Sequence, residues 1–371
     1  MHSALQIHVG KTAYAHLQHH GLRAQDIAVI PAAAGGPKGL ILQAMDQWLF
    51  GEWLPSAPRE RSLIGASIGS WRMAAASCAD PVAAFGRLGD LYCEQSYPEK
   101  PSAHYVTTEI QSLLKAFIGG YEKEIVEQPW HRLHLMTNRG LGRLDAPSSE
   151  AKAKYGFVAA TFANLGSRSR LAKHLDRVVI GDARDPLPWL KASFDRFNTQ
   201  FCPLAQDNLT PALLASGTLP LIMEPVNHIP HAPRGTYWDG GIIDYHLAFP
   251  YSRLNDTTDA NNASSELVLY PHFTDHIIPG WLDKALPWRR AHAWQHRHWL
   301  DNVIMVSPSK DFLKMLPRGK LPDRKDFFHY GTNHHERISA WKTAIAESAR
   351  LRDELIAFIE KPDLNKVQRF Y

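Results

Sequence analysis

The stretch Leu63-Ile64-Gly65-Ala66-Ser67-Ile68-Gly69 organises the first part of this chain. An apolar run leads into a serine between two glycines, and the helix-forming segment Trp71-Arg72-Met73-Ala74-Ala75-Ala76 follows. This order predicts a strand, a tight turn and a helix. Gly65 and Gly69 suit such a turn because only glycine leaves space on both sides of the serine. The turn would hold Ser67 in a strained conformation with its hydroxyl projecting at a helix N-terminus, an arrangement called a nucleophile elbow.

A second strand, loop and helix precede this stretch. The run Ile27-Ala28-Val29-Ile30 predicts a strand, Gly35-Gly36-Pro37-Lys38-Gly39 a loop, and residues 40–50 an amphipathic helix. The two units lie about thirty residues apart, which is the spacing of a βαβ motif. We therefore expect two parallel neighbouring strands that build one edge of the sheet, with both loops at the same end of the strands.

Apolar segments farther along the chain predict further strands, at residues 133–136, 177–180, 266–270 and 303–306. Residues 334–359 place large apolar side chains mostly three and four positions apart, which predicts one long helix. Alternating strands and helices predict the α/β class: three layers, with a mostly parallel central sheet and helices on both faces. No internal repeat or domain boundary is evident. We expect one domain over residues 1–371, in which 25–250 carry the motifs and 265–371 extend the same domain.

The composition is typical of a globular enzyme. Of the 371 residues, 44% are hydrophobic and 21% charged, and no apolar run is long enough to span a bilayer. The 41 Lys and Arg are dispersed among 37 Asp and Glu, so we expect no nucleic-acid partner. Because no secretory signal is evident, we expect a cytoplasmic location, with peripheral membrane contact left open. The scattered cysteines Cys78, Cys93 and Cys202 predict reduced thiols.

A serine nucleophile needs a proton acceptor within hydrogen-bond reach, and the chain offers Asp239. This aspartate ends the aromatic strand predicted by Thr236-Tyr237-Trp238. Gly240-Gly241 follows it and allows the backbone to turn close against another element. The same residues also fit an ordinary turn, so the assignment of Asp239 as the base depends on the other motifs.

The upstream loop offers backbone N–H groups to an anion. Gly35, Gly36 and Lys38 can donate, whereas Pro37 has no N–H. The bound anion would be either a phosphate or the oxyanion of a tetrahedral acyl intermediate. The loop lacks the first glycine of a dinucleotide fingerprint and the Ser or Thr of a P-loop. Beside a nucleophile elbow it is a candidate oxyanion hole.

Taken in order, these motifs resemble those of the patatin-like phospholipases, a family of lipid acyl hydrolases. The family's signature is a glycine-rich loop with a basic residue, then Gly-x-Ser-x-Gly, then Asp-Gly-Gly or Asp-Gly-Ala well downstream. In this chain the three parts are Ala34-Gly35-Gly36-Pro37-Lys38-Gly39, Gly65-Ala66-Ser67-Ile68-Gly69 and Asp239-Gly240-Gly241. A fourth match, Leu214-Ala215-Ser216-Gly217-Thr218-Leu219-Pro220, resembles the family's Ala-Ser-x-x-x-Pro helix end. The resemblance covers residues 25–250.

The resemblance implies a patatin-like α/β fold and a serine acyl hydrolase with a Ser-Asp dyad. Ser67 would be the nucleophile, Asp239 its base without a histidine, and Gly35, Gly36 and Lys38 the oxyanion hole. The implied substrate is a lipid or phospholipid acyl ester, and no cofactor or metal is implied. The loop departs from the family in two ways: it begins with alanine in place of glycine, and its basic residue is lysine instead of arginine.

Two other interpretations of the same residues stay open. In the α/β-hydrolase order of serine, acid and histidine, His246 or His272 would complete a triad with Ser67 and Asp239. Alternatively, the chain is a non-catalytic lipid-binding protein whose dyad is vestigial. Reactivity toward acyl substrates and serine probes separates this second alternative from the enzyme.

The C-terminal third carries two further patterns. His292, His296 and His298 are close in sequence but lack the glutamate of a His-Glu-x-x-His zinc motif. The stretch from 281 to 299 is rich in tryptophan and arginine and includes Trp288 and Trp294. This composition suits either a helix packed on the sheet or a bilayer interface. We hypothesise that the stretch borders the entrance for an acyl chain.

Overall fold

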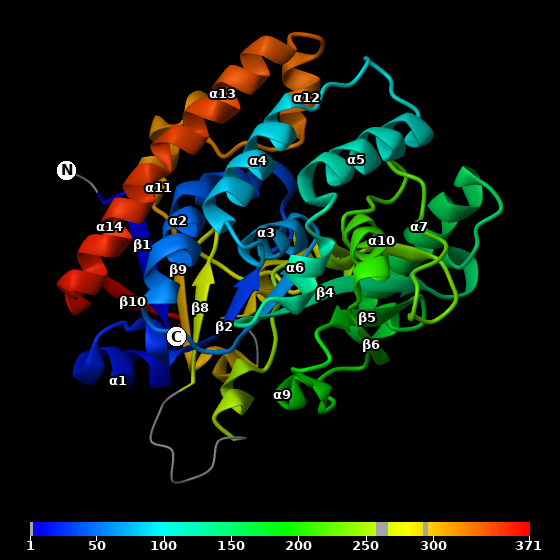
Figure 1. The fold of residues 1–371 in the computed structure, drawn as a ribbon. Helices are drawn as coiled ribbons and strands as arrows, with labels where there is room; N and C mark the ends of the chain where they lie inside the picture. Colours follow the sequence, from blue (N-terminus) through cyan, green and yellow to red (C-terminus); the bar gives the residue numbers. More distant parts are fainter. Residues whose placement is uncertain (1–2, 257–265, 292–295) are drawn as a thin grey trace.

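The computed structural model describes residues 3–256, 266–291 and 296–371. Within these residues, ten strands form one mixed, mostly parallel sheet (Figure 1). The strands are β1 (Leu5–Val9), β2 (Ile27–Ala32), β3 (Arg61–Ala66), β4 (His131–Gly140), β5 (Leu175–Gly181), β6 (Thr199–Pro203), β7 (Tyr237–Asp239), β8 (Leu267–Pro271), β9 (Val303–Pro308) and β10 (Val367–Arg369). Their order is β10-β1-β9-β8-β2-β3-β4-β5-β6, and β7 pairs with β4. The predicted α/β class and mostly parallel sheet are confirmed.

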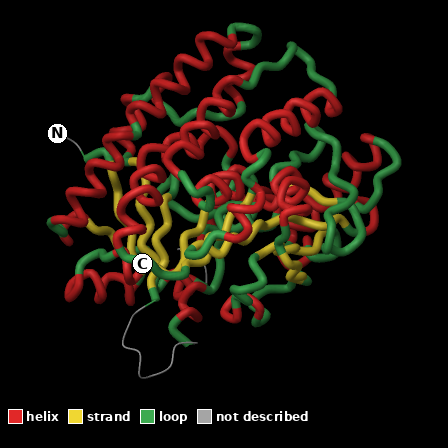
Figure 2. The backbone as a smooth tube through the Cα atoms, in the orientation of Figure 1, coloured by secondary structure: helices red, strands yellow, loops and turns green. Residues whose placement is uncertain are grey.

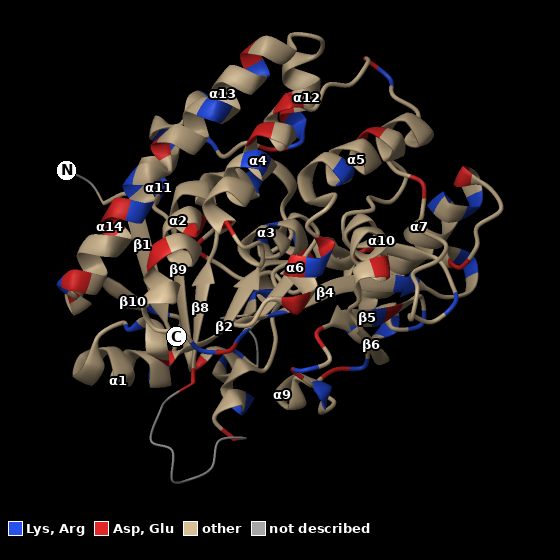
Figure 3. Cartoon of the chain, viewed as in Figure 1, with Lys and Arg blue, Asp and Glu red and all other residues tan. Residues whose placement is uncertain are grey.

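Helices surround this sheet, as Figure 2 shows. The α-helices of the described residues are α1 (Lys11–His20), α2 (Gln43–Trp48), α3 (Ile68–Ala76), α4 (Pro81–Glu94), α5 (Ala103–Ile118), α6 (Glu122–Glu127), α7 (Glu150–Gly166), α8 (Arg168–Leu171), α9 (Pro188–Lys191), α10 (Gln206–Ser216), α11 (Lys310–Met315), α12 (Lys325–Tyr330), α13 (His334–Glu347) and α14 (Ala349–Glu360). In Figure 1, α4, α5 and α13 lie above the sheet, α14 lies at the left beside β1, and α1 and α9 lie below the sheet. None of the described helices has the length and apolar character needed to cross a bilayer. Positively and negatively charged residues are interspersed over the helices and loops (Figure 3).

Strands β2 and β3 lie in the middle of the sheet and position the two loops. All of β2 is buried, as expected for a parallel strand covered on both faces. Ala32 lies beside Gly65 at the carboxyl ends of the two parallel strands, so the glycine loop and the serine turn emerge side by side. The prediction that these strands build an edge of the sheet is wrong, because β8 pairs with β2 and β4 with β3 on their outer sides. Pairing between strands so distant in sequence leaves no trace in local periodicity.

Two helix predictions need correction. The helix expected over residues 40–50 consists of three short pieces: a 3₁₀ segment (Gly36–Leu42), α2 and a π-helical turn (Leu49–Trp53). The long helix expected over residues 334–359 is two helices, α13 and α14, which meet at Ser348. The Ser348 hydroxyl donates at 2.6 Å to the carbonyl oxygen three residues earlier. A serine that bonds the backbone in this way competes with helical hydrogen bonding and favours the break.

The sequence analysis missed strands at both ends of the sheet. β1 and β10 pair with each other in parallel, and β1 pairs antiparallel with β9. β6 forms the other end, pairing with β5, and much of it is partly exposed. These strands are short and mix polar with apolar residues, so their local signal is weak. Strands β8, β9 and β10 bring residues from the C-terminal third into the same sheet as the motif-bearing strands.

The three cysteines are free thiols, as predicted. Burial raises the pKa of Cys78 and of Cys93 to about 12 and also raises the pKa of Cys202. Because the thiolate is the reactive form of cysteine, these side chains are poor nucleophiles near neutral pH.

Candidate active site

Ser67 stands at the turn between β3 and α3 in a backbone conformation that few residues adopt. Its φ is +56° and its ψ is −127°, outside the ordinary regions for an L-amino acid. A Cβ added at Gly65 would lie 2.5 Å from the Ser70 backbone, and one added at Gly69 would lie 1.9 Å from the Ala32 carbonyl oxygen. Both distances are too short for any side chain. The two glycines therefore allow the turn to pack directly against β2 and α3, as a nucleophile elbow requires.

Replacing Gly69 by alanine should destabilise the protein severely. The added methyl would collide with backbone atoms of β2, which cannot move without disturbing the centre of the sheet. We expect a loss of at least about 3 kcal/mol in the free energy of unfolding, measured by chemical denaturation. Gly86→Ala in α4 is the matched control, because the nearest atom to its Cβ position is a side-chain atom 3.8 Å away. It should stabilise the protein by about 0.5–1 kcal/mol, and an equal loss in both variants would contradict the packing argument.

The hydroxyl of Ser67 and the carboxylate of Asp239 are in direct contact. Ser67 Oγ donates a hydrogen bond of 2.8 Å to Asp239 Oδ2, and the two residues are only 4% and 2% exposed. The other carboxylate oxygen, Oδ1, accepts from Gly241 N at 2.7 Å. The Asn138 side chain, from the neighbouring strand β4, donates to the Asp239 carbonyl oxygen at 2.6 Å. The carboxylate is thus fixed in orientation and needs no intervening group to reach the serine.

Burial raises the pKa of Asp239 above that of an ordinary carboxyl group. Four effects oppose the shift without cancelling it: the charge of Arg324, the hydrogen bonds from Ser67 and Gly241, and the charge of Lys284. A carboxylate with a raised pKa is a stronger proton acceptor than one in water. The site therefore contains a hydroxyl and a base in contact with it, and burial makes this carboxylate a stronger proton acceptor than an exposed one.

The predicted oxyanion loop lies against the turn that follows Asp239. Gly36 has φ +57°, the left-handed region that favours glycine, and a Cβ there would lie 3.1 Å from Arg324 Nε. A Cβ at Gly35 would lie 2.5 Å from the Phe273 ring, and a Cβ at Gly241 would lie 2.7 Å from Ala34 Cβ. The loop, the turn after Asp239 and the C-terminal third are thus in close contact. Lys38 follows in the same loop, with Nζ 5.6 Å from the centroid of the Phe273 ring.

Ser216, at the C-terminal end of α10, contacts the nucleophile turn. Reasoning from the residues alone did not identify this contact. Its Oγ accepts from Ser67 N at 2.9 Å, pairs with Ser70 Oγ at 2.7 Å and donates to the Met136 carbonyl oxygen at 2.7 Å. The side chain is fully buried. The only signal in the sequence was the resemblance of residues 214–220 to a family motif. Ser216 ties the amide of the nucleophile to β4 and so helps to orient the elbow.

The variant Ser216→Ala should lower kcat about tenfold while leaving KM for a small ester nearly unchanged. Loss of this hydroxyl leaves the buried Ser67 N–H without its acceptor and loosens the reacting group, not the substrate. Steady-state kinetics on a p-nitrophenyl ester measure both constants. Ser216→Thr keeps the hydroxyl and should retain most of the activity. A rise in KM with kcat unchanged would contradict this positioning role.

The histidines considered for a triad are buried and bonded elsewhere. His246 Nδ1 accepts from Ile278 N at 3.1 Å, and His272 Nδ1 accepts from Thr274 N at 2.9 Å. Burial lowers the pKa of His272 to about 3 and puts that of His246 well below its usual value. Among the described residues, neither ring has a hydrogen bond with Ser67 or Asp239. The two rings pack against each other, with centroids 4.3 Å apart.

The structure describes two of the three clustered histidines in the C-terminal third. His292 lies outside the described residues, whereas His296 and His298 line a cavity of about 810 Å³ with several arginines. Over residues 3–256, 266–291 and 296–371, no group of three potential metal ligands is found.

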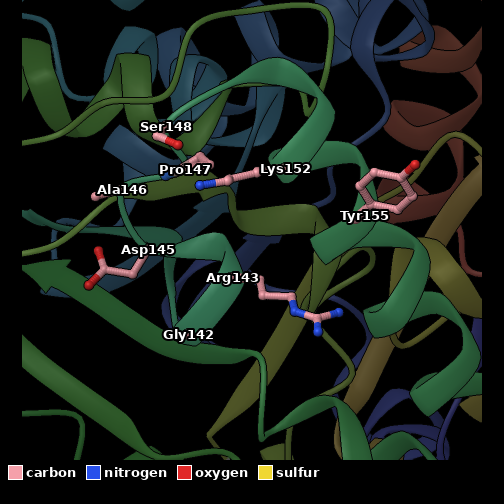
Figure 4. Close-up of a pocket in the computed structure, with 8 residues that line it drawn as sticks. All are labelled: Gly142, Arg143, Asp145, Ala146, Pro147, Ser148, Lys152 and Tyr155. Carbon is pink, nitrogen blue, oxygen red and sulfur yellow. The ribbon is translucent and has the colours of Figure 1, made fainter.

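A second cavity, of about 620 Å³, opens near the start of α7 (Figure 4). It is lined by Gly142, Arg143, Asp145, Ala146, Pro147, Ser148, Lys152 and Tyr155. Neither cavity is lined by Ser67 or Asp239.

Comparison with known proteins does not assign this chain to a family. No protein-family model matches its sequence, and no curated protein is significantly similar to it. Its chemistry is therefore inferred from the geometry of the site. That geometry comprises a strained serine, a buried carboxylate in contact with it, and a glycine loop from the neighbouring strand.

Proposed function

We propose that this protein is a serine acyl hydrolase that cleaves lipid or phospholipid acyl esters with a dyad of Ser67 and Asp239. The observation that carries the proposal is the 2.8 Å hydrogen bond from Ser67 Oγ to Asp239 Oδ2 at a strained turn. A three-layer, patatin-like form of the α/β fold belongs to the same proposal. The order of the motifs along the chain and the parallel pairing of β2 with β3 support it.

In the proposed reaction, Asp239 accepts the hydroxyl proton as Ser67 Oγ attacks the ester carbonyl carbon. The carbonyl oxygen becomes the oxyanion of a tetrahedral intermediate. When this collapses, the bond to the alcohol breaks, the alcohol takes the proton from Asp239, and an acyl-serine remains. Water then attacks the acyl carbon while Asp239 accepts a proton from it. The fatty acid leaves as Ser67 recovers its proton, so that Asp239 acts alternately as base and acid.

The oxyanion would be stabilised by the loop after β2. The N–H groups of Gly35 and Gly36 donate to no protein acceptor among the described residues, which leaves them available to a ligand. Lys38 adds a positive charge in the same loop. Preorganised donors of this kind stabilise charge that develops in the transition state, and each contributes about 10²–10³-fold in rate where it has been removed from other enzymes.

The dyad is favoured over a serine, aspartate and histidine triad by the hydrogen bonds of the histidines. A triad histidine must bond both the serine and the acid. His246 and His272 instead bond backbone atoms of residues 276–278 and 274, and Ser67 already donates directly to Asp239.

Peripheral contact with a lipid surface is also part of the proposal. Trp288 is 65% exposed and is followed by the partly exposed Arg289 and Arg290. A tryptophan beside arginines suits the interface of an anionic bilayer. Trp294, from the same stretch, lies outside the described residues.

The experiment that tests the proposed function is incubation of the purified protein with a mixed lipid extract, followed by mass spectrometry of the products. We expect free fatty acids with the wild-type protein and none with Ser67→Ala. Release of no fatty acid by the wild-type protein, together with no labelling by a fluorophosphonate, would favour the non-catalytic lipid-binding alternative.

A further inference from the structure

Helix α7 exposes its largest apolar side chains and buries its smallest. Four large side chains, three and four positions apart, lie on one side of the helix and are each 45–70% exposed. We name them the α7 face: Tyr155, Val158, Phe162 and Leu165. The buried residues of the same helix are Ala153, Gly156, Ala160 and Asn164. A helix of a globular protein ordinarily turns its large apolar residues toward the core, so the α7 face indicates a surface that a partner covers.

The contacts of the buried side of α7 fix this orientation. A Cβ added at Gly156 would lie 2.6 Å from Leu144 Cδ2, so the helix approaches its neighbour too closely for a larger residue. Asn164 Nδ2 donates to Asp283 Oδ1 at 2.8 Å. Phe157 lies edge-on against the ring of the buried Trp238, with centroids 4.9 Å apart. The helix therefore cannot rotate to bury the α7 face without losing these contacts.

The exposed Trp288 lies near one end of the α7 face. Arg289 Nη2 donates to the Leu165 carbonyl oxygen at 3.3 Å, which brings the 3₁₀ turn Pro287–Arg289 to the C-terminal end of α7. Arg289 also pairs with Asp283 at 2.8 Å, the same carboxylate that binds Asn164. The tryptophan and the helix are thus held together through one buried acid, and their exposed apolar side chains belong to the same region of the surface.

Cations flank the α7 face at both ends. Residues 155–166 include no charged side chain. The exposed cations of residues 143–173 are Arg143, Lys152, Lys154, Arg170 and Lys173. The exposed acids of the same range are Asp145 and Glu150. At the start of the helix, Arg143 and Lys152 line the same cavity as Tyr155 (Figure 4). This surface is therefore apolar in the middle and mainly positive at its ends.

We propose that the α7 face, together with Trp288, docks this protein on an anionic lipid surface. The inference rests on the lipid contact included in the proposed function, and it needs no activity of the dyad. Apolar side chains would enter the boundary between headgroups and acyl chains, while the flanking cations meet anionic headgroups. Tyrosine and tryptophan suit this boundary because each has an apolar ring and a polar group. A second copy of the chain is a poorer partner, since two α7 faces paired in either direction would bring cations onto cations.

The test measures binding of the Ser67→Ala protein, which cannot form an acyl-serine, to vesicles of phosphatidylcholine and phosphatidylserine in equal parts. We expect Phe162→Ser and Leu165→Ser each to lower the partition coefficient about tenfold, because each removes apolar area that the bilayer would bury. Both side chains are exposed, so the unfolding midpoint should not change. Met315→Ser is the matched control. At 53% exposed it resembles Leu165, but it lies in α11 on the opposite side of the molecule (Figure 1) and should leave binding unchanged.

A second pair of variants tests the charge. Lys152→Gln combined with Lys154→Gln should lower binding to these vesicles about tenfold, because each lysine near an anionic surface contributes to the attraction. The weaker binding to vesicles of phosphatidylcholine alone should stay the same. An equal loss on both kinds of vesicle would contradict the role of the cations and overturn the preference for anionic lipid.

The remaining outcomes separate this inference from its alternatives. Unchanged binding in Phe162→Ser and Leu165→Ser, or an equal loss in Met315→Ser, would overturn it. A wild-type dimer that dissociates in Phe162→Ser, without vesicle binding, would overturn it in favour of a second copy. Loss of binding in Trp288→Ala alone would keep the lipid contact of the proposed function and overturn the role of α7. Vesicle binding through the α7 face by a protein that hydrolyses no ester would contradict only the proposed hydrolysis.

Discussion

Replacing Ser67 by alanine should lower kcat for a p-nitrophenyl ester about 10⁴-fold or more and abolish covalent labelling by a fluorophosphonate. Without Oγ no acyl-serine can form, and the remaining groups can only bind substrate and polarise its carbonyl. The side chain is small and sits in a conformation that alanine can share with serine at similar strain. The folded structure should therefore persist, which circular dichroism and the unfolding midpoint would verify.

The control for this experiment is a serine outside the dyad. Ser193 is exposed and lies outside the dyad, so Ser193→Ala should retain full activity and full labelling. Labelling that persists in Ser67→Ala, or that is lost equally in Ser193→Ala, would place the nucleophile elsewhere.

Replacing Asp239 by asparagine should lower kcat about 10³–10⁴-fold, because an amide keeps the shape of the carboxyl but accepts no proton from Ser67. The variant should also lose a pH dependence. Only the ionised carboxylate is a base, and burial raises its pKa, so wild-type kcat/KM should rise with pH through a midpoint above the usual carboxyl value. Asp239→Asn should lack that rise. A pH-rate profile of both proteins measures the difference.

The same experiment discriminates between the dyad and the triad. Normal turnover in a folded Asp239→Asn protein, together with loss of turnover in His246→Ala or His272→Ala, would favour a histidine base. We expect the opposite result: turnover should be lost in Asp239→Asn and retained in His246→Ala and His272→Ala. Both histidines are fully buried, so their variants must be compared at equal folded fraction.

Local sequence was sufficient to predict the strand and turn that carry Ser67 and the strand that ends at Asp239. The glycines around Ser67 predicted a turn because their requirement for space is a property of a few neighbouring residues. The apolar runs of β2, β3, β4, β5, β8 and β9 predicted strands because burial on both faces selects continuous apolar sequence. The aromatic run ending at Asp239 likewise became β7.

Distant contacts could not be predicted in this way. Ser67 and Asp239 are 172 positions apart, and the sequence offered His246 and His272 as further partners until their own hydrogen bonds were seen. The central place of β2 and β3 depends on β8 pairing with β2, and the support of the Ser67 amide depends on Ser216 from α10. Periodicity reports which face of an element is buried but not which distant element covers it.

The charges around the dyad illustrate the same division. Lysines and arginines are frequent in this chain, and the sequence marks no difference between a paired cation and an unpaired one. Only the fold shows that Asp283 and Asp326 bond other cations, whereas the charges of Lys284 and Arg324 act on Asp239. The strained serine was therefore readable from its neighbours, because local sterics determine it. Asp239 was named as the base only through the order of the motifs and the family that this order resembles. Its contact with Ser67, the support of the elbow and the surrounding charge arise from long-range packing, which no local pattern reports.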